Sequence, residues 1–231
     1  MDEKPFLKRK FYGRRKGRSL GKKRDNLVAS LLPHIKITLD ADTEFPVDPT
    51  SFFSPPPKEV WLEIGFGQGE HLSALAQQHP NIGFIGCEPF INGVSALLCD
   101  IQDHGLENIR IWPDDARDLM DALPDQCLDR CFLIHPDPWP KTKHHKRRFI
   151  QNETVDTLAR LLKSGAELRI ATDDPDLCNW MLEHIDNHSA FQWLARCQQD
   201  WQTQPEDWPV LTKYGQKQLA GTPVYLLFER V

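Results

Sequence analysis

Short apolar runs that alternate with segments of helical spacing are the feature of this sequence that most narrows its fold. The apolar runs are typical of buried strands, and each is soon followed by glycine, proline or acidic residues. They cover residues 60–64, 82–87, 109–112, 132–134 and 166–171. The segments of helical spacing between them cover residues 71–78, 92–103 and 154–162. This alternation predicts an α/β fold, a Rossmann-like doubly wound sheet with ligands at the carboxyl ends of its strands.

The remaining segments are predicted from weaker signals. Residues 177–185 have helical spacing, and residues 191–195 and 224–228 are predicted strands. The helix over 154–162 should end at the turn-forming run Lys163-Ser164-Gly165. Two further segments complete the prediction, a helical turn followed by a strand over 27–39 and a polar loop over the strand ends at 201–221.

The distribution of charge suggests a nucleic-acid partner. The chain has 231 residues, enough for one sizeable domain, and a net charge of −5. Residues 1–24 contain eleven Lys or Arg against two acids, about +9, so we predict a basic flexible arm there and a single domain over residues 25–231. A basic arm on an acidic body favours nucleic acid over a membrane surface, because no amphipathic apolar face accompanies the charges. A solubilising tail is the alternative.

Cysteine usage and hydropathy indicate the compartment. The six cysteines include no Cys-x-x-Cys pair, so we expect reduced thiols and no zinc site. No stretch approaches the apolar length of a membrane span, and the N-terminus lacks the apolar core of a signal peptide. We therefore expect a cytoplasmic protein.

A glycine-rich turn follows the first predicted strand of the sheet. Gly65, Gly67 and Gly69 form a G-x-G-x-G pattern, which allows tight turning and close approach of a ligand to the backbone. It differs from the dinucleotide pattern G-x-G-x-x-G, and Glu70 stands where the next helix begins. With Glu63 just before it, this turn suits a cofactor that has a cationic end and no pyrophosphate, such as S-adenosylmethionine.

Acidic residues recur at the ends of the following strands. Glu88 lies nineteen residues beyond Gly69, where a Rossmann-like sheet places the carboxylate that accepts hydrogen bonds from the ribose hydroxyls of adenosine. Asp115 could accept a hydrogen bond from the adenine amino group, or it could cap the next helix. Asp137 and Asp173 follow the fourth and fifth strands. We expect these acids to share one edge of the sheet, with the basic arm lying outside their row.

Residues 132–148 combine a buried strand, a rigid acidic turn and a cationic loop. Asp137 stands between Pro136 and Pro138, which restrict the backbone on both sides and so hold its carboxylate in place. Trp139 adds an aromatic surface. The loop that follows suits phosphate oxygens, although a solvated loop is the plain alternative. Its basic residues are Lys141, Lys143, His144, His145, Lys146, Arg147 and Arg148.

Taken together, these motifs resemble those of the bacterial tRNA (guanine-N7)-methyltransferases, which are S-adenosylmethionine-dependent enzymes. The resemblance covers roughly residues 60–231, and Pro136-Asp137-Pro138-Trp139 with its basic loop is the most distinctive part. It implies the class I methyltransferase sheet, mostly parallel with an antiparallel C-terminal strand. It also implies methyl transfer to N7 of a guanine in tRNA, expected to be guanine 46 of the variable loop. No obligate protein partner is implied.

The resemblance assigns roles to individual residues. It implies cofactor binding by Glu63, Glu88, Asp115 and Asp137, next to the backbone of Gly65, Gly67 and Gly69. It also places Asp137 at the catalytic centre. Contact with RNA is implied for Lys141, Asp173, Thr212, Lys213, Tyr214 and Gly215. The family usually has glutamate where this chain has Gly215, whereas Lys217 matches the family pattern.

The chemistry of such a transfer follows from the substrate atom. Guanine N7 carries an unprotonated lone pair, so it can attack a sulfonium methyl group without a general base, and no metal is required. We assign Asp137 the work of orienting the guanine and stabilising the positive charge that develops on it.

Three other classes of protein share parts of this pattern. An exocyclic-amine methyltransferase would have Asn/Asp-Pro-Pro-aromatic at this strand end, but here a second consecutive proline is missing after Asp137. An NAD-dependent oxidoreductase would need the turn G-x-G-x-x-G. A non-catalytic RNA-binding module would account for the basic segments and leave the strand-end acids without a role.

Overall fold

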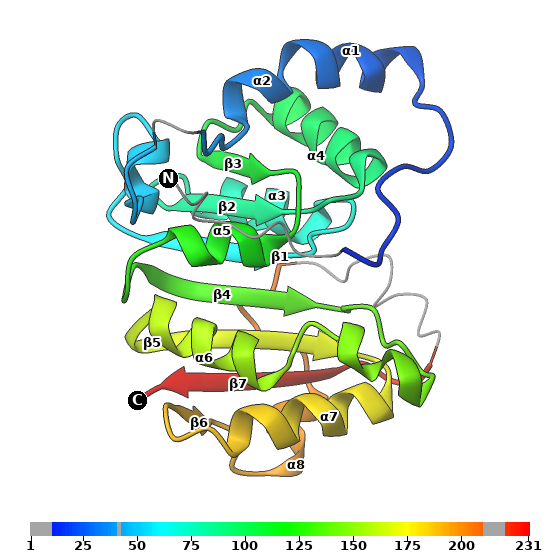
Figure 1. Cartoon of the computed structure of the whole chain (residues 1–231), viewed down its shortest axis with the longest axis vertical. Coiled ribbons are helices and arrows are strands. Elements are labelled where there is room, and N and C mark those ends of the chain that lie inside the picture. Colours follow the sequence, from blue (N-terminus) through cyan, green and yellow to red (C-terminus); the bar gives the residue numbers. More distant parts are fainter. Residues whose placement is uncertain (1–10, 41–42, 210–219) are drawn as a thin grey trace, which may run out of the picture.

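The computed structural model describes residues 11–40, 43–209 and 220–231, and the strands within them form one seven-stranded sheet (Figure 1). The order of strands is β3-β2-β1-β4-β5-β7-β6. Strands β1 to β5 run parallel, whereas β7 lies antiparallel between β5 and β6. The strands are β1 (Val60–Ile64), β2 (Gly83–Cys87), β3 (Ile109–Trp112), β4 (Leu128–Ile134), β5 (Leu162–Thr172), β6 (Phe191–Trp193) and β7 (Val224–Arg230). The predicted antiparallel C-terminal strand is therefore confirmed.

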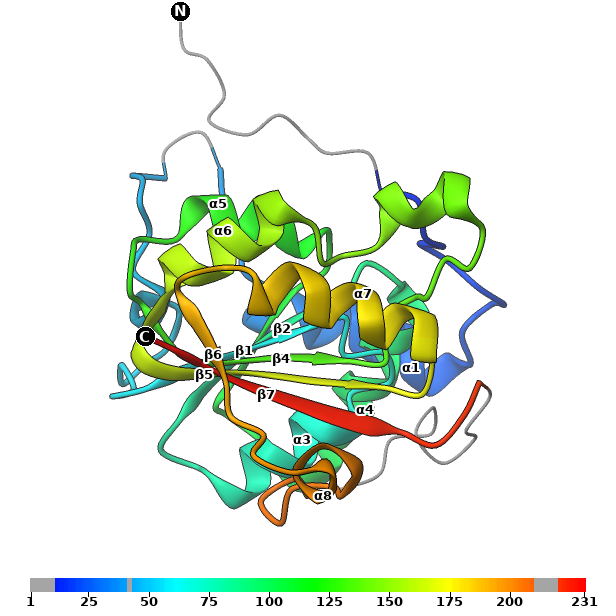
Figure 2. The same cartoon turned by 90° about the horizontal axis from the view of Figure 1, so that it is seen from below.

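Helices cover both faces of the sheet, as Figure 2 shows. One face carries α3 (Glu70–Gln78), α4 (Ile91–His104) and α8 (Gln198–Gln202), with α1 (Lys22–Ser30) packed on α4 and α2 (Leu32–Ile35) beside β3. The other face carries α5 (Ala116–Ala122), α6 (Asn152–Leu161) and α7 (Pro175–Asp186). Short 3-10 helices, η1 (Pro49–Phe52) and η2 (Thr142–Arg147), lie in the connections. None of the described helices combines the length and apolarity needed to cross a bilayer.

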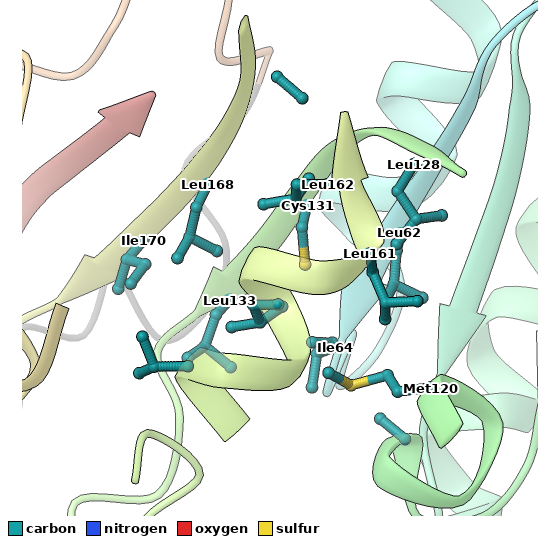
Figure 3. Packing of buried hydrophobic residues seen from close by; sticks show 14 of the residues in the cluster. Leu62, Ile64, Met120, Leu128, Cys131, Leu133, Leu161, Leu162, Leu168 and Ile170 are labelled. Atoms are coloured by element: carbon teal, nitrogen blue, oxygen red, sulfur yellow. The ribbon is translucent and has the colours of Figure 1, made fainter. Parts of the chain in front are cut away.

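Strand β1 shows why the predicted apolar runs form the centre of the sheet. Its side chains alternate in direction, so Leu62 and Ile64 enter one core while Trp61 enters the other. Every residue of the strand is buried, as expected for a central parallel strand with helices on both faces. Figure 3 shows Leu62 and Ile64 in the first of these cores, together with Met120 of α5. Glu63 lies on the opposite side and points toward α3.

The prediction of a turn between α6 and β5 was wrong. The strand begins at Leu162 and continues through Lys163-Ser164-Gly165, where its pairing with β4 shifts register. Leu161 and Leu162 are both fully buried, so the chain passes from helix to sheet inside the core. Burial of these side chains overrides the turn propensity of the polar run, and Gly165 with φ +81° accommodates the irregular backbone.

Other differences concern segments with weak sequence signals. The apolar spacing does not define α5, and the cap that Asp115 was one candidate to provide is the sequence signal that marks its start. Over 27–39 the predicted helical turn is confirmed, since the chain forms the end of α1 and then α2, whereas the strand predicted after it is reduced to a bridge between Lys36 and Ile111. Of the loop predicted over the strand ends at 201–221, residues 210–219 lie outside the described residues. Before them Trp208 packs on the face of the sheet, and after them Ala220 donates a hydrogen bond to Asp173 at the end of β5.

The order of strands reverses between β1 and β4. From β1 the chain moves outward to β2 and β3, and it then returns to the other side of β1 as β4. In an open α/β sheet, ligands bind at the carboxyl ends of the strands beside such a reversal. The glycine turn, Glu88 and Asp137 follow β1, β2 and β4 respectively, so the fold brings them to this one edge.

Candidate active site

The glycine turn after β1 has open space beside its backbone. Gly65, Gly67 and Gly69 have φ values of +70°, +59° and +84°, which other residues rarely adopt. A Cβ atom added at Gly65 or Gly67 would meet no atom within 4 Å. Glu70 opens α3 directly after the turn, where the pyrophosphate of a dinucleotide would require the opposite charge. The turn therefore fits a cofactor without phosphates that approaches the backbone closely.

Glu88 holds this turn to the end of β2. Its carboxylate accepts hydrogen bonds from the backbone N–H groups of Gly67 and Phe90, both at 2.9 Å. Burial raises the pKa of Glu88 to about 7 even though these hydrogen bonds act in the opposite direction. A carboxylate has about four lone-pair sites, so Glu88 can still accept hydrogen bonds from the hydroxyls of a ligand.

Asp115 is bound by the first turn of its own helix. Its Oδ1 accepts hydrogen bonds from the backbone N–H of Arg117 at 3.1 Å and from Nε of Arg117 at 2.9 Å. Its Oδ2 accepts another from Nη2 of Arg117 at 2.5 Å. The capping role that the sequence left open is thus present, and Oδ2 keeps a lone pair for a further donor.

Asp137 projects from a turn with strained backbone on both sides. His135 and Trp139 have φ values of +48° and +45°, in the left-handed region that residues with side chains seldom occupy. Asp137 is exposed, yet partial desolvation by the protein around it raises the pKa of its carboxyl group above the usual range. Its negative charge contributes to the raised pKa of Glu88, so the two acids belong to one site.

Arg148 supports the Asp137 turn from the protein side. Its side chain is only 1% exposed, so it does not share the exposed position of the lysines in the predicted cationic loop. Its Nε donates a hydrogen bond to the carbonyl oxygen of Pro138 at 2.9 Å, and its Nη2 pairs with Asp176 near the start of α7. Its guanidinium carbon lies 5.0 Å from the ring centroid of Trp180, also on α7. Arg148 therefore ties the turn to α7.

The lysines of the basic loop are free to meet an anionic partner, since all of them are exposed. They are Lys141, Lys143 and Lys146. The guanidinium carbon of Arg147 instead lies between two aromatic rings, 4.6 Å from the centroid of Tyr12 and 4.9 Å from that of Trp139. This stacking joins the N-terminal segment to the Asp137 turn.

Residues 11–18 follow the carboxyl ends of the strands, so the expectation that the arm lies outside the row of acids was wrong for this part. Nη2 of Arg15 pairs with Oδ1 of Asp114, just after β3, at 2.6 Å. The N–H of Gly17 donates to Oδ1 of Asn92, on the first turn of α4, at 2.7 Å. The chain then enters α1, which begins within the range predicted for the arm.

Asp173 lies beside the Asp137 turn at the end of β5. Its Oδ1 is 3.6 Å from Nδ1 of His135, and its Oδ2 accepts a hydrogen bond from the backbone N–H of Ala220 at 3.1 Å. Desolvation lowers the pKa of His135. Of the other residues predicted to contact RNA, Thr212, Lys213, Tyr214 and Gly215, with the matching Lys217, lie outside the described residues.

Glu63 completes the row of acids in a more enclosed position. Its Oε2 lies 2.8 Å from Nδ1 of His71, the second residue of α3. The side chains of Glu63 and His71 are 3% and 1% exposed. The sequence contains no signal for this pair, because it is formed only when α3 packs on β1.

The fold and this edge together define a class of enzyme. Residues 57–227 match a protein family described as "Putative methyltransferase". Among solved structures, the 16S rRNA methyltransferase KamB superposes with a TM-score of 0.56 at 16% identity, covering 82% of this chain and 95% of that one. The aminoglycoside resistance methyltransferase NpmB1 gives 0.52 at 18% identity, covering 76% and 88%. The fold is that of the class I S-adenosylmethionine-dependent methyltransferases, as the sequence predicted.

Closer relatives identify the family. The tRNA (guanine-N(7)-)-methyltransferase of Rhodospirillum rubrum is 47% identical over 233 residues, covering 100% of this chain and 91% of its own length. That of Roseobacter denitrificans is 48% identical over 228 residues, covering 96% of each chain. The chain belongs to the tRNA (guanine-N7)-methyltransferase family.

Proposed function

We propose that this protein transfers a methyl group from S-adenosylmethionine to N7 of guanine 46 in the variable loop of tRNA. Membership of the family supplies the reaction, the methyl donor and the substrate class. The position within tRNA rests on the resemblance of the motifs. One observation supports a catalytic role for this edge of the sheet: the carboxylate of Glu88 accepts a hydrogen bond from Gly67 of the open glycine turn at 2.9 Å, and the charge of Asp137 helps to raise its pKa.

The strand-end acids are proposed to bind the cofactor. Glu88 accepts hydrogen bonds from the ribose hydroxyls, since its carboxylate is held by backbone donors and retains free lone pairs. Asp115 accepts one from the adenine amino group through Oδ2. Glu63 stands two residues before the glycine turn, near the end of β1, so we assign it to the amino-acid end of the cofactor.

Asp137 is proposed to act on the guanine. When bound, S-adenosylmethionine supplies an electrophilic methyl group on a positively charged sulfur. The carboxylate of Asp137 can accept hydrogen bonds from the N1 and N2 edge of guanine, which orients N7 for in-line attack. The same negative charge stabilises the positive charge that develops on the purine ring. Since N7 carries no proton, Asp137 has an electrostatic and orienting role and does not act as a base.

The basic segments beside this edge are proposed to bind the tRNA backbone. Lys141, Lys143 and Lys146 are exposed next to the Asp137 turn, and the arm adds the exposed residues Arg14, Lys16 and Arg18. Positive charge of this density on one side of the site suits several phosphates at once. Asp173 and residues 212–215 are assigned to RNA contact on the resemblance of the motifs.

The proposed function also implies a domain organisation and a cellular compartment. We infer an RNA-binding arm over residues 1–24, a single methyltransferase domain over residues 25–231, and action in the cytoplasm without an obligate protein partner. The bonds of residues 11–18 to α4 and the β3 end support an arm that remains close to the site.

The direct test is to map the methylated nucleotide. The protein is incubated with bulk tRNA and S-adenosylmethionine carrying a labelled methyl group, and the label is located by nuclease digestion and chromatography. We expect N7-methylguanosine at position 46, and no label in a tRNA whose guanine 46 is replaced by adenine. Label on an exocyclic amine or at another position would contradict the proposal.

A further inference from the structure

His71 is a buried titratable residue that the proposed reaction does not use. It lies on the first turn of α3, and its side chain is 1% exposed. Nδ1 is 2.8 Å from Oε2 of Glu63. Nε2 is buried and has no hydrogen-bond partner among the described residues. Burying an imidazole with one unpaired nitrogen costs free energy. We therefore ask what the hydrogen bond between Nδ1 and Glu63 contributes to the protein.

The carboxylate of Glu63 is held by a side chain, that of His71, whereas the carboxylate of Glu88 is held by the backbone. The carboxylate of Glu88 is held by two backbone N–H groups of fixed geometry. Within the described part of the chain, the hydrogen bond to the carboxylate of Glu63 comes from the imidazole of His71. Such a donor fixes the orientation of a buried carboxylate and offsets the cost of removing its oxygen atoms from water.

Aromatic rings fix the direction of the imidazole. The ring centroids of Phe132 and Trp208 lie 4.9 Å and 5.6 Å from that of His71. Trp208 is itself held, because its carbonyl oxygen accepts a hydrogen bond from Gln204 at 2.8 Å and the neighbouring Asp207 pairs with Arg169 at 2.7 Å. The apolar walls give Nε2 no partner, so the arrangement keeps Nδ1 as the donor to Glu63.

We propose that His71 is a positioning residue, which holds the carboxylate of Glu63 in the orientation that the cofactor requires. This inference rests on the proposed role of Glu63 at the amino-acid end of S-adenosylmethionine. His71 does not reach the guanine in this arrangement, so it governs cofactor affinity and leaves the methyl-transfer step unchanged.

Two substitutions distinguish the effect of the hydrogen-bond donor from the effect of the aromatic ring. In His71→Asn the side-chain amide nitrogen occupies the place of Nδ1 and can still donate to Glu63, whereas His71→Leu removes the donor. Both lose the edge and tilted ring contacts with Phe132 and Trp208, so both should lower the melting temperature. We expect the dissociation constant of S-adenosylmethionine, measured by calorimetry below both melting transitions, to rise about tenfold in His71→Leu and less than about threefold in His71→Asn.

Steady-state kinetics with tRNA give an independent readout. His71→Leu should raise the KM for S-adenosylmethionine while kcat at saturating cofactor stays within about twofold of the native value. Equal loss of cofactor affinity in the Leu and Asn variants would show a merely structural role and overturn the inference. So would a native dissociation constant in His71→Leu.

Glu63→Gln distinguishes this failure from failure of the proposed function. If Glu63→Gln weakens cofactor binding while His71→Leu does not, the role of Glu63 stands and that of His71 is overturned. If Glu63→Gln binds cofactor as tightly as the native protein, the assignment of Glu63 itself is wrong, and the inference about His71 falls with it.

Discussion

Nε of Arg148 donates a hydrogen bond to the carbonyl oxygen of Pro138 at 2.9 Å, so the end of the basic loop holds the turn that presents Asp137. The contact explains how a strained turn can present the proposed catalytic carboxylate in a fixed position, because strained backbone persists only where surrounding contacts determine it. The prolines alone restrict their neighbours, and Arg148 fixes the whole turn against α7.

Replacing Arg148 should therefore lower both the stability of the folded protein and its turnover. Arg148→Ala leaves the Pro138 carbonyl unpaired and removes the stacking on Trp180, so we expect the free energy of unfolding to fall by about 2–3 kcal/mol. Urea denaturation measures this change. The matched control is Lys146→Ala, an exposed neighbour in the same loop. It should leave stability within about 0.5 kcal/mol and weaken tRNA binding instead. Equal stability of the two variants would contradict the anchoring role.

Removing the charge of Asp137 should slow the chemical step. Asp137→Asn keeps the shape and much of the hydrogen bonding, so we expect turnover at saturating substrates to fall on the order of a hundredfold with little change in tRNA affinity. Single-turnover rates and filter binding measure the two quantities. Near-native turnover would refute an electrostatic role.

The titration of Glu88 should appear in the stability of the protein without cofactor. The pKa of Glu88 is raised from its ordinary 4.5 to about 7, so between these values the folded protein holds a proton that the unfolded chain has released. The free energy of unfolding should consequently decrease as pH rises through this window, and the Glu88 contribution should level off above it. Comparing urea midpoints of the native protein and Glu88→Gln across the window isolates this contribution. Parallel pH profiles would contradict the raised pKa.

Cofactor affinity should change with pH in the opposite sense. The ionised carboxylate of Glu88 is the better acceptor for ribose hydroxyls, so lowering the pH from about 8 to about 6 should weaken binding up to about tenfold. Glu88→Ala should bind cofactor poorly at every pH while retaining its tRNA affinity. Calorimetry at several pH values checks both statements. A dissociation constant that is independent of pH and of this substitution would remove Glu88 from the ribose site.

The exposed cations of the arm should contribute to tRNA binding through phosphates. In the triple variant Arg14→Ala, Lys16→Ala, Arg18→Ala, the slope of log affinity against log salt should flatten by up to about three units, because each lost phosphate contact removes nearly one. Single-turnover rates at saturating tRNA should barely change. The matched control is Lys58→Ala, an exposed lysine just before β1, at the opposite edge of the sheet. An unchanged slope in the triple variant would favour a solubilising tail.

The sequence predicts the strands of the sheet well for a physical reason. Parallel strands covered on both faces, such as β1 and β2, consist almost entirely of apolar residues, and this signal lies within the strand itself. Glycine at a turn and an acid at a strand end are equally local, which is why the row from Glu63 to Asp173 was found. The same reasoning fails between α6 and β5, because burial of side chains in the core, and not the local sequence, determines that a strand forms there in place of a turn.

Buried polar contacts could not be predicted because they join residues only through tertiary packing. Arg148 and Lys146 look alike in the sequence, yet one is buried against Trp180 and the other is exposed. His71 could equally have been a surface residue of α3 until the helix was packed on β1. The placement of Arg15 against Asp114 likewise depends on where the chain enters α1.

The antiparallel course of β7 separates the end of the chain from the chemistry. β7 starts beside Thr172, at the carboxyl end of β5, and runs back to the other side of the sheet, where Val231 is 49% exposed (Figure 1). A surface or probe attached through this terminus would leave the row of acids and the lysine loop unobstructed. The molecule can therefore be tethered by Val231 with the edge that is proposed to bind tRNA directed into solution.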